Sequence, residues 1–142
     1  MVLASRLQLI SLYFEFSKEL RNVKILIVDD NKCLASILQM MLEDEGYEAR
    51  SAEDGGDGYQ AYLLFQPDLV ITDIQMPVKS GIELIALIRR HDPNVRIVYM
   101  SGNLDRFQSV LEEEKKKYQV TFLEKPFSKA ELMKLLSEYS CI

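Results

Sequence analysis

The sequence predicts an α/β domain whose doubly wound parallel sheet is covered by helices on both faces. Short apolar runs, rich in β-branched residues, alternate five times with segments of helical periodicity. Acidic, hydroxyl or lysine side chains follow directly after most of these runs. A length of 142 residues, 48% of them hydrophobic, suits a single domain that can bury a core.

The first half of the pattern begins with a central strand. Val23 to Val28 is apolar apart from Lys24, which is typical of a strand buried on both faces. A helix is predicted from about Lys32 to Glu45, with Gly46 as its stop. The weaker, alternating strand from Tyr47 to Ala52 is expected near the edge of the sheet.

A glycine-rich stretch comes next. Asp54 to Gly58 contains three glycines, but their spacing matches neither a dinucleotide fingerprint nor a P-loop, so a flexible loop is predicted. A helix is expected from Gly58 to Phe65. The apolar strand from Leu69 to Thr72 then ends at Asp73, and Pro77 forces a turn.

The second half repeats the alternation. A helix from Ser80 to Arg90 begins with a predicted capping box, and a fourth strand, Val95 to Met100, ends at Ser101. A helix is expected from Leu104 to Tyr118, and its charged run from Glu112 to Lys117 is interpreted as a solvated face. The remaining predicted elements are a strand from Val120 to Leu123 and a helix that starts at a second capping box, Ser128 with Glu131.

Composition narrows the classes of protein. A net charge of −5 and a pI of about 5.0 argue against a free-standing nucleic-acid binder. Cys33 and Cys141 are far apart and lack metal-ligand spacing, so we expect a reducing compartment and no disulfide framework. No apolar stretch is long enough to span a membrane, and we expect a cytoplasmic location.

Residues 1–22 stand apart as an apolar segment that is predicted to be helical. Such a helix must cover something, either its own domain or a second chain, which makes a homodimer contact one possibility. A frayed extension is the alternative.

Residues that can perform chemistry cluster at the predicted strand ends: Asp29, Asp30, Asp73, Ser101 and Lys125. In a sheet of strand order 2-1-3-4-5 these ends converge on one crevice. Grouped carboxylates repel unless a cation neutralises them, and hard oxygen ligands suit Mg²⁺. Lysine, a hydroxyl group and the open space at Gly102 then favour phosphoryl chemistry, with Asp73 as the nucleophile.

This ordered set resembles response-regulator receiver domains, the CheY-like module of two-component signalling. The matching residues are Asp29-Asp30, Asp73 to Pro77, Ser101 and Lys125-Pro126-Phe127, and the resemblance covers about residues 23–140. It implies a flavodoxin-like (βα)5 fold for residues 23–142, with residues 1–22 as an extension. It also implies a sensor histidine kinase as phosphodonor and an unknown downstream protein or output domain as partner, with no direct nucleic-acid contact.

The resemblance implies a role for each site residue. Asp73 is the expected phosphoacceptor, and Mg²⁺ is expected on Asp30, Asp73 and the backbone carbonyl of Gln75, with Asp29 acting through a water molecule. Lys125 is expected to pair with the phosphoryl oxygens, and its bond to Pro126 to be cis. Ser101 is expected to swing toward the phosphate, and Phe122 occupies the position of an aromatic switch; a Phe with no switching role is the alternative.

Departures from the family pattern are few. Ser101 replaces the commoner threonine and keeps the hydroxyl group. Tyr118-Gln119 stands where a Gly-Ala pair is usual before the fifth strand, which concerns the shape of the neighbouring helix face and not the chemistry.

Two other functions compete. A haloacid-dehalogenase-like phosphatase needs an acid two residues after the nucleophile, and Gln75 cannot serve as one. A receiver-like interaction module that is never phosphorylated would normally have lost one acid or the lysine, whereas this chain keeps them all. The sequence therefore favours a phosphorylation-dependent switch whose output face is formed by the fourth helix, the fifth strand and the fifth helix.

Overall fold

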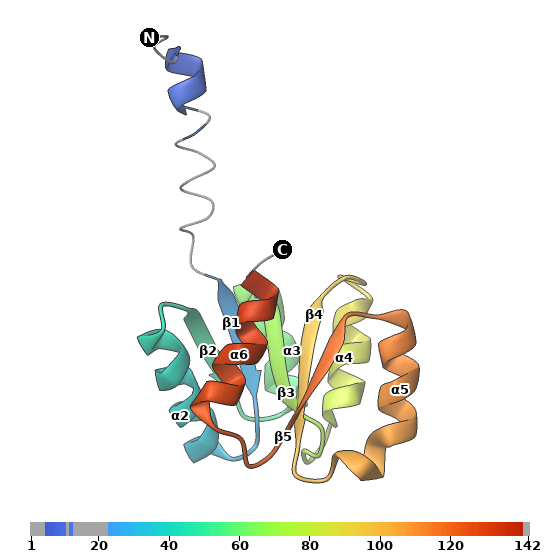
Figure 1. Cartoon of the computed structure of the whole chain (residues 1–142). Helices are drawn as coiled ribbons and strands as arrows, with labels where there is room; N and C mark the ends of the chain where they lie inside the picture. Colours follow the sequence, from blue (N-terminus) through green and yellow to red (C-terminus); the bar gives the residue numbers. More distant parts are fainter. Residues whose placement is uncertain (1–4, 11, 13–22, 141–142) are drawn as a thin grey trace.

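The computed structural model describes residues 5–10, 12 and 23–140. Five parallel strands form one sheet in the order β2-β1-β3-β4-β5, which confirms the predicted topology (Figure 1). The strands are β1 (Lys24–Val28), β2 (Glu48–Ala52), β3 (Leu69–Asp73), β4 (Arg96–Ser101) and β5 (Val120–Glu124). The helices between them are α2 (Lys32–Asp44), α3 (Gly55–Phe65), α4 (Gly81–Arg89), the 3₁₀ turn η1 (Leu104–Phe107), α5 (Gln108–Lys117) and α6 (Lys129–Ser140).

Helices cover both faces of the sheet, as the doubly wound pattern requires. On one face, α2 and α6 bury Leu38, Leu42, Leu132 and Leu136 against the strands. On the other face, α3, α4 and α5 pack over a second cluster that includes the fully buried Leu84 and Ile88. Because β3 lies between β1 and β4, all five of its residues are buried.

Capping residues set where the helices begin. The Ser80 side chain accepts a hydrogen bond from the Glu83 amide at the start of α4, which is one of the two bonds of the predicted capping box. The three-glycine stretch was wrongly predicted to be a loop: α3 begins at Gly55, because the Asp54 carboxylate accepts from the Asp57 amide and caps the helix there.

The predicted helix from Leu104 to Tyr118 is divided. Its first residues form η1, and α5 proper starts at Gln108. The prediction that its whole charged run is solvated is wrong at Glu114, whose side chain is 14% exposed and pairs with the 8% exposed side chain of Arg89. The partner lies 25 residues earlier in the chain, so local spacing gave no sign of it.

Only part of the N-terminal segment lies within the described residues. Residues 6–10 and 12 are helical, and Ser5 and Gln8 cap one another reciprocally. Leu7, Leu9, Ile10 and Leu12 are all exposed, so this part of the segment does not cover its own domain. The rest of the predicted helical extension, and Cys141, lie outside the described residues.

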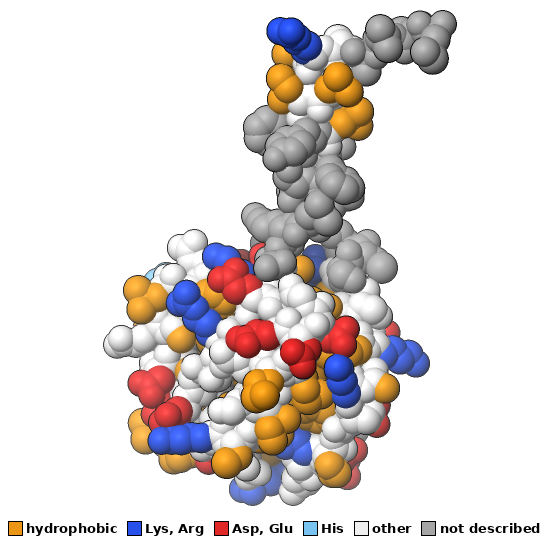
Figure 2. Space-filling view, turned by 90° about the vertical axis from the view of Figure 1, so that its left-hand side faces the viewer, with side chains coloured by type: hydrophobic (Ala, Val, Ile, Leu, Met, Phe, Trp, Pro, Cys, Tyr) orange, Lys and Arg blue, Asp and Glu red, His pale blue; other side chains and the backbone are white. Residues whose placement is uncertain are grey.

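Two observations concern the membrane and the charge of the surface. No helix among the described residues is long and apolar enough to cross a bilayer. On the α2 side of the domain, basic side chains are scattered among acidic and hydrophobic ones (Figure 2).

Candidate functional site

The C-terminal ends of four strands place the predicted site residues at one edge of the sheet. Asp29 follows β1, Asp73 ends β3, Ser101 ends β4 and Lys125 follows β5. The order of the strands makes them neighbours, because Asp73 pairs with Met100 in the register of β3 and β4. The amide of Lys125 donates to the carbonyl of Ser101 at 2.8 Å, which holds the loop after β5 beside β4.

Three carboxylates meet at this edge. Oxygens of Asp29, Asp30 and Asp73 all lie within 4.8 Å of one another. Asp29 and Asp73 are buried and Asp30 is exposed, which leaves the cluster open to solvent on one side. Hard oxygen donors at this spacing, with room for water, fit Mg²⁺. The backbone of Gln75, the other expected ligand, belongs to an exposed residue just after β3.

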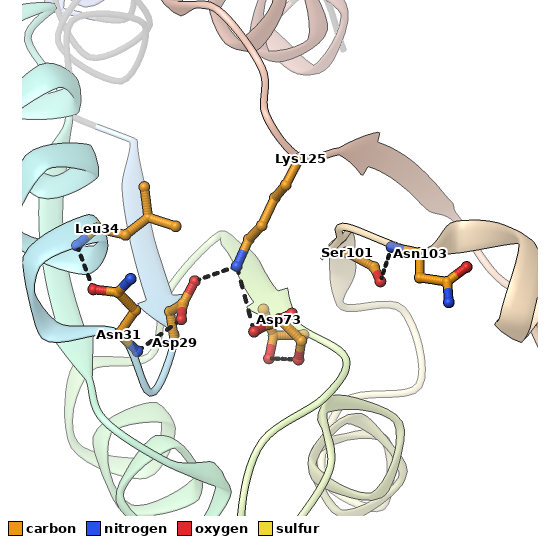
Figure 3. A network of polar contacts seen from close by, with 8 residues as sticks. Asp29, Asn31, Leu34, Asp73, Ser101, Asn103 and Lys125 are labelled. Atoms are coloured by element: carbon orange, nitrogen blue, oxygen red, sulfur yellow. Dashed lines mark hydrogen bonds and ion pairs between the residues drawn. The ribbon is translucent and has the colours of Figure 1, made fainter.

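Lys125 lies between two of these acids (Figure 3). Its Nζ is 2.7 Å from Asp29 Oδ2 and 3.3 Å from Asp73 Oδ2. Burial lowers the pKa of Lys125, but its hydrogen bond to Asp29 and the charges of both acids outweigh this, so the pKa is raised and the ammonium group stays charged. Asp29 is fixed from its other side, because its Oδ1 accepts from the Asn31 amide at 2.9 Å.

Neighbouring groups have opposing effects on the pKa of Asp73. Burial raises the pKa of its carboxyl group above the ordinary value of 3.8, Lys125 lowers it and Asp29 raises it again, with a net increase. Three acids against one lysine leave an excess of negative charge, which a divalent cation would balance.

Ser101 is buried, and its hydroxyl oxygen accepts from the Asn103 amide at 3.0 Å, so its side chain is engaged away from Asp73 (Figure 3). Gly102 has open space where a side chain would be. Phe122 is half-buried and stacks on Tyr99, with ring centroids 6.5 Å apart. The Lys125–Pro126 peptide bond is cis, the geometry that the resemblance implied.

Sequence reasoning missed one residue that shapes the site. A Cβ atom at Gly81 would lie 2.1 Å from the backbone oxygen of Asp73, so only glycine allows α4 to begin against the end of β3. The Gly81 amide donates to the carbonyl of Ile74 and fixes the loop between them. The contact joins residues eight positions apart through a loop whose path the sequence does not reveal.

The comparisons with known proteins agree with this geometry. The family model described as the response regulator receiver domain matches residues 25–137. Chemotaxis protein CheY of Halobacterium salinarum is 32% identical over 120 residues, which span 81% of this chain and 94% of that protein. Sporulation initiation phosphotransferase F of Bacillus subtilis is also 32% identical over 120 residues, with 83% of this chain and 94% of that protein covered.

Solved structures give the same result. CheY4 of Vibrio cholerae superposes with a TM-score of 0.76 at 27% identity, over 83% of this chain and 98% of that one. NtrX of Brucella abortus has a TM-score of 0.71 at 29% identity, and the match spans 84% of this chain but only 27% of that longer protein. With its strand order, its acidic cluster and these matches in agreement, the chain belongs to the response-regulator receiver domains of two-component systems.

Proposed function

We propose that this receiver domain takes a phosphoryl group on Asp73 from the phosphohistidine of a sensor kinase. A carboxylate oxygen of Asp73 forms the new P–O bond as the P–N bond to the donor imidazole breaks, and the nitrogen leaves with the electron pair. The supporting observation is that two further carboxylates, Asp29 and Asp30, and the Lys125 ammonium group lie around Asp73.

Each neighbouring residue has a task in this proposal. Asp29, Asp30, Asp73 and the Gln75 carbonyl would hold Mg²⁺, which supplies charge neutralisation on the transferring group. Lys125, already within 3.3 Å of Asp73, would pair with a phosphoryl oxygen. The open space at Gly102 would admit the phosphoryl group.

Phosphorylation of Asp73 would change the positions of Ser101 and Phe122, and through them the output face. Ser101 would exchange its bond from the Asn103 amide for a hydrogen bond that it donates to the phosphoryl oxygen, drawing the loop after β4 toward the site. Phe122 would then change its position against Tyr99. The face formed by α5, β5 and α6 would thereby pass the signal to a partner protein or an output domain.

Intact mass spectrometry tests the proposal. We expect incubation with acetyl phosphate and Mg²⁺ to add one phosphoryl group to the wild-type protein and none to Asp73→Asn. Asp57→Asn, at an exposed acid in the first turn of α3, is the matched control and should be phosphorylated normally. No mass gain in any of the proteins would instead favour a receiver-like module that acts without phosphorylation.

A further inference from the structure

A part-buried ionic network joins α4, α5 and β4. Arg89 Nη1, at the end of α4, donates to Glu114 Oε1 of α5 at 2.8 Å. The other oxygen of Glu114 accepts from the hydroxyl group of Tyr99 on β4 at 2.7 Å. Burial and the nearby Glu114 raise the pKa of Tyr99, so its hydroxyl group remains a donor. One carboxylate thus connects α5 to both α4 and the sheet.

Tyr118 closes this network from outside. The Arg89 guanidinium carbon lies 3.6 Å from the centroid of the Tyr118 ring. Nε and Nη2 of Arg89 are buried and have no hydrogen-bond acceptor among the described residues, so the ring face and Glu114 are what offset the buried charge. Tyr118 thus adds an aromatic contact to the Arg89–Glu114 ion pair.

The two ends of the η1–α5 segment are held very differently. Neither η1 nor α5 has a side-chain hydrogen bond at its N-cap, and Leu111 is the one buried residue within α5. Just before η1, a Cβ atom at Gly102 would have no neighbouring atom within 4 Å. The start of the segment is therefore held by the apolar packing of Leu104 and Phe107 without a cap, whereas its later half is also tied down by the ion pair of Glu114.

We propose that Glu114 is a positioning residue that anchors the later half of α5 in both states of the switch. On this view, which rests on the proposed phosphorylation of Asp73, the movement that follows Ser101 is confined to η1 and the first turns of α5. Residues 112–118 stay fixed against α4 and act as the pivot. A partner that senses phosphorylation must then contact the early part of the segment or the neighbouring Phe122.

Relative magnitudes favour an anchor over a latch that opens. Leaving one charge of a buried ion pair without its partner typically shifts an equilibrium by about 10²–10³-fold or more. Allosteric coupling between two sites is typically about 5–150-fold. Breaking the Arg89–Glu114 pair would therefore cost at least as much as phosphorylation typically supplies. The arrangement that keeps the pair intact in both states is favoured.

Residue-resolved amide hydrogen exchange by NMR tests the anchor, with beryllofluoride and Mg²⁺ as the phosphoryl analogue. In the wild-type protein, we expect beryllofluoride and Mg²⁺ to change the amide exchange rates of residues 102–111. The rates of residues 112–118 should stay within about twofold of their values without the analogue. In Glu114→Ala, binding of the analogue should also change the amide exchange rates of residues 112–118, by about fivefold or more. Tyr99→Phe removes one hydroxyl group, keeps the ring and should give a smaller effect in the same direction.

Glu113→Gln is the matched control, because Glu113 pairs with exposed Lys116 on the outer side of the same helix. It should behave as the wild type does. An equal response in both halves of α5 of the wild type, or a wild-type pattern in both Glu114→Ala and Tyr99→Phe, would overturn the anchor and leave the switch intact. No response to loading in any segment would overturn the switch itself and the pivot with it.

Discussion

Burial and the neighbouring Asp29 carboxylate both oppose ionisation of Asp73, and Lys125 offsets them only in part. The folded protein therefore holds the Asp73 proton more tightly than the unfolded chain does. Between pH 3.8 and the higher pKa of the folded state, the unfolded chain binds fewer protons, so this group lowers the free energy of unfolding as pH rises.

Replacing Asp73 with asparagine should remove that effect. In urea unfolding without Mg²⁺, we expect Asp73→Asn to gain stability over the wild type as pH rises through this window, and to keep the gain at neutral pH. Adding Mg²⁺ should shrink the difference, because the cation stabilises the ionised site of the wild-type protein. A difference that is constant from pH 3 to pH 7 would contradict the electrostatic explanation.

Gly81 shows how a residue without a side chain can shape a site. Because an added Cβ would meet the Asp73 carbonyl at 2.1 Å, Gly81→Ala must displace α4 or the end of β3. We expect it to cost about 1–3 kcal/mol in unfolding free energy and to slow phosphorylation by acetyl phosphate.

Gly102→Ala is the comparison for this prediction, since nothing lies within 4 Å of its added methyl group. Its stability should change by less than about 1 kcal/mol. Equal losses of stability in the two variants would show that the close approach at Gly81 is unimportant.

At the scale of elements, the loop between β3 and α4 contains a strained residue. Val78 has a φ of 69° and is 94% exposed, although β-branched residues rarely adopt left-handed backbone. Val78→Gly should relieve this strain and raise the unfolding free energy by about 0.5–1 kcal/mol. Val110→Gly, at an exposed position of α5, should do the opposite because glycine weakens a helix, and chemical denaturation would reveal either sign.

Strand positions could be predicted because strands carry their signal locally. The apolar runs and the polar residues that end them placed Asp29, Asp73, Ser101 and Lys125 correctly, and the crossover rules then gave their convergence. The roles of these residues in phosphorylation and Mg²⁺ binding, and those of Gln75 and Phe122, stay predictions.

What the sequence did not reveal depends on contacts between distant segments or on a single cap. The part-buried Arg89–Glu114 pair could not be predicted, because the sequence does not distinguish one acid in a charged run from its solvated neighbours. The start of α3 was predicted too late in the chain because three glycines disfavour a helix, whereas the Asp54 side chain caps one at this position. The close approach of Gly81 to Asp73 depends on the path of the intervening loop.

At the scale of the whole molecule, the described part of the N-terminal segment exposes four large aliphatic side chains, at Leu7, Leu9, Ile10 and Leu12. Exposed apolar side chains grouped on one helix mark a contact surface, and we expect them to form a homodimer. Light scattering should give a dimer for the wild type and a monomer when all four are changed to serine. Changing Ile37 and Met40, which are similarly exposed on α2, to serine should leave the dimer intact, with the same molar mass by light scattering. A monomeric wild-type protein would contradict the prediction.

The hydrogen bond between Lys125 and Asp29 joins residues 96 positions apart. Under the proposed function, a chain still emerging from the ribosome stays unreactive toward donors until its last strand has left the exit tunnel and docked. Signalling competence would thus be acquired only once the whole sheet has formed, and chains without β5 would not divert phosphate from folded domains.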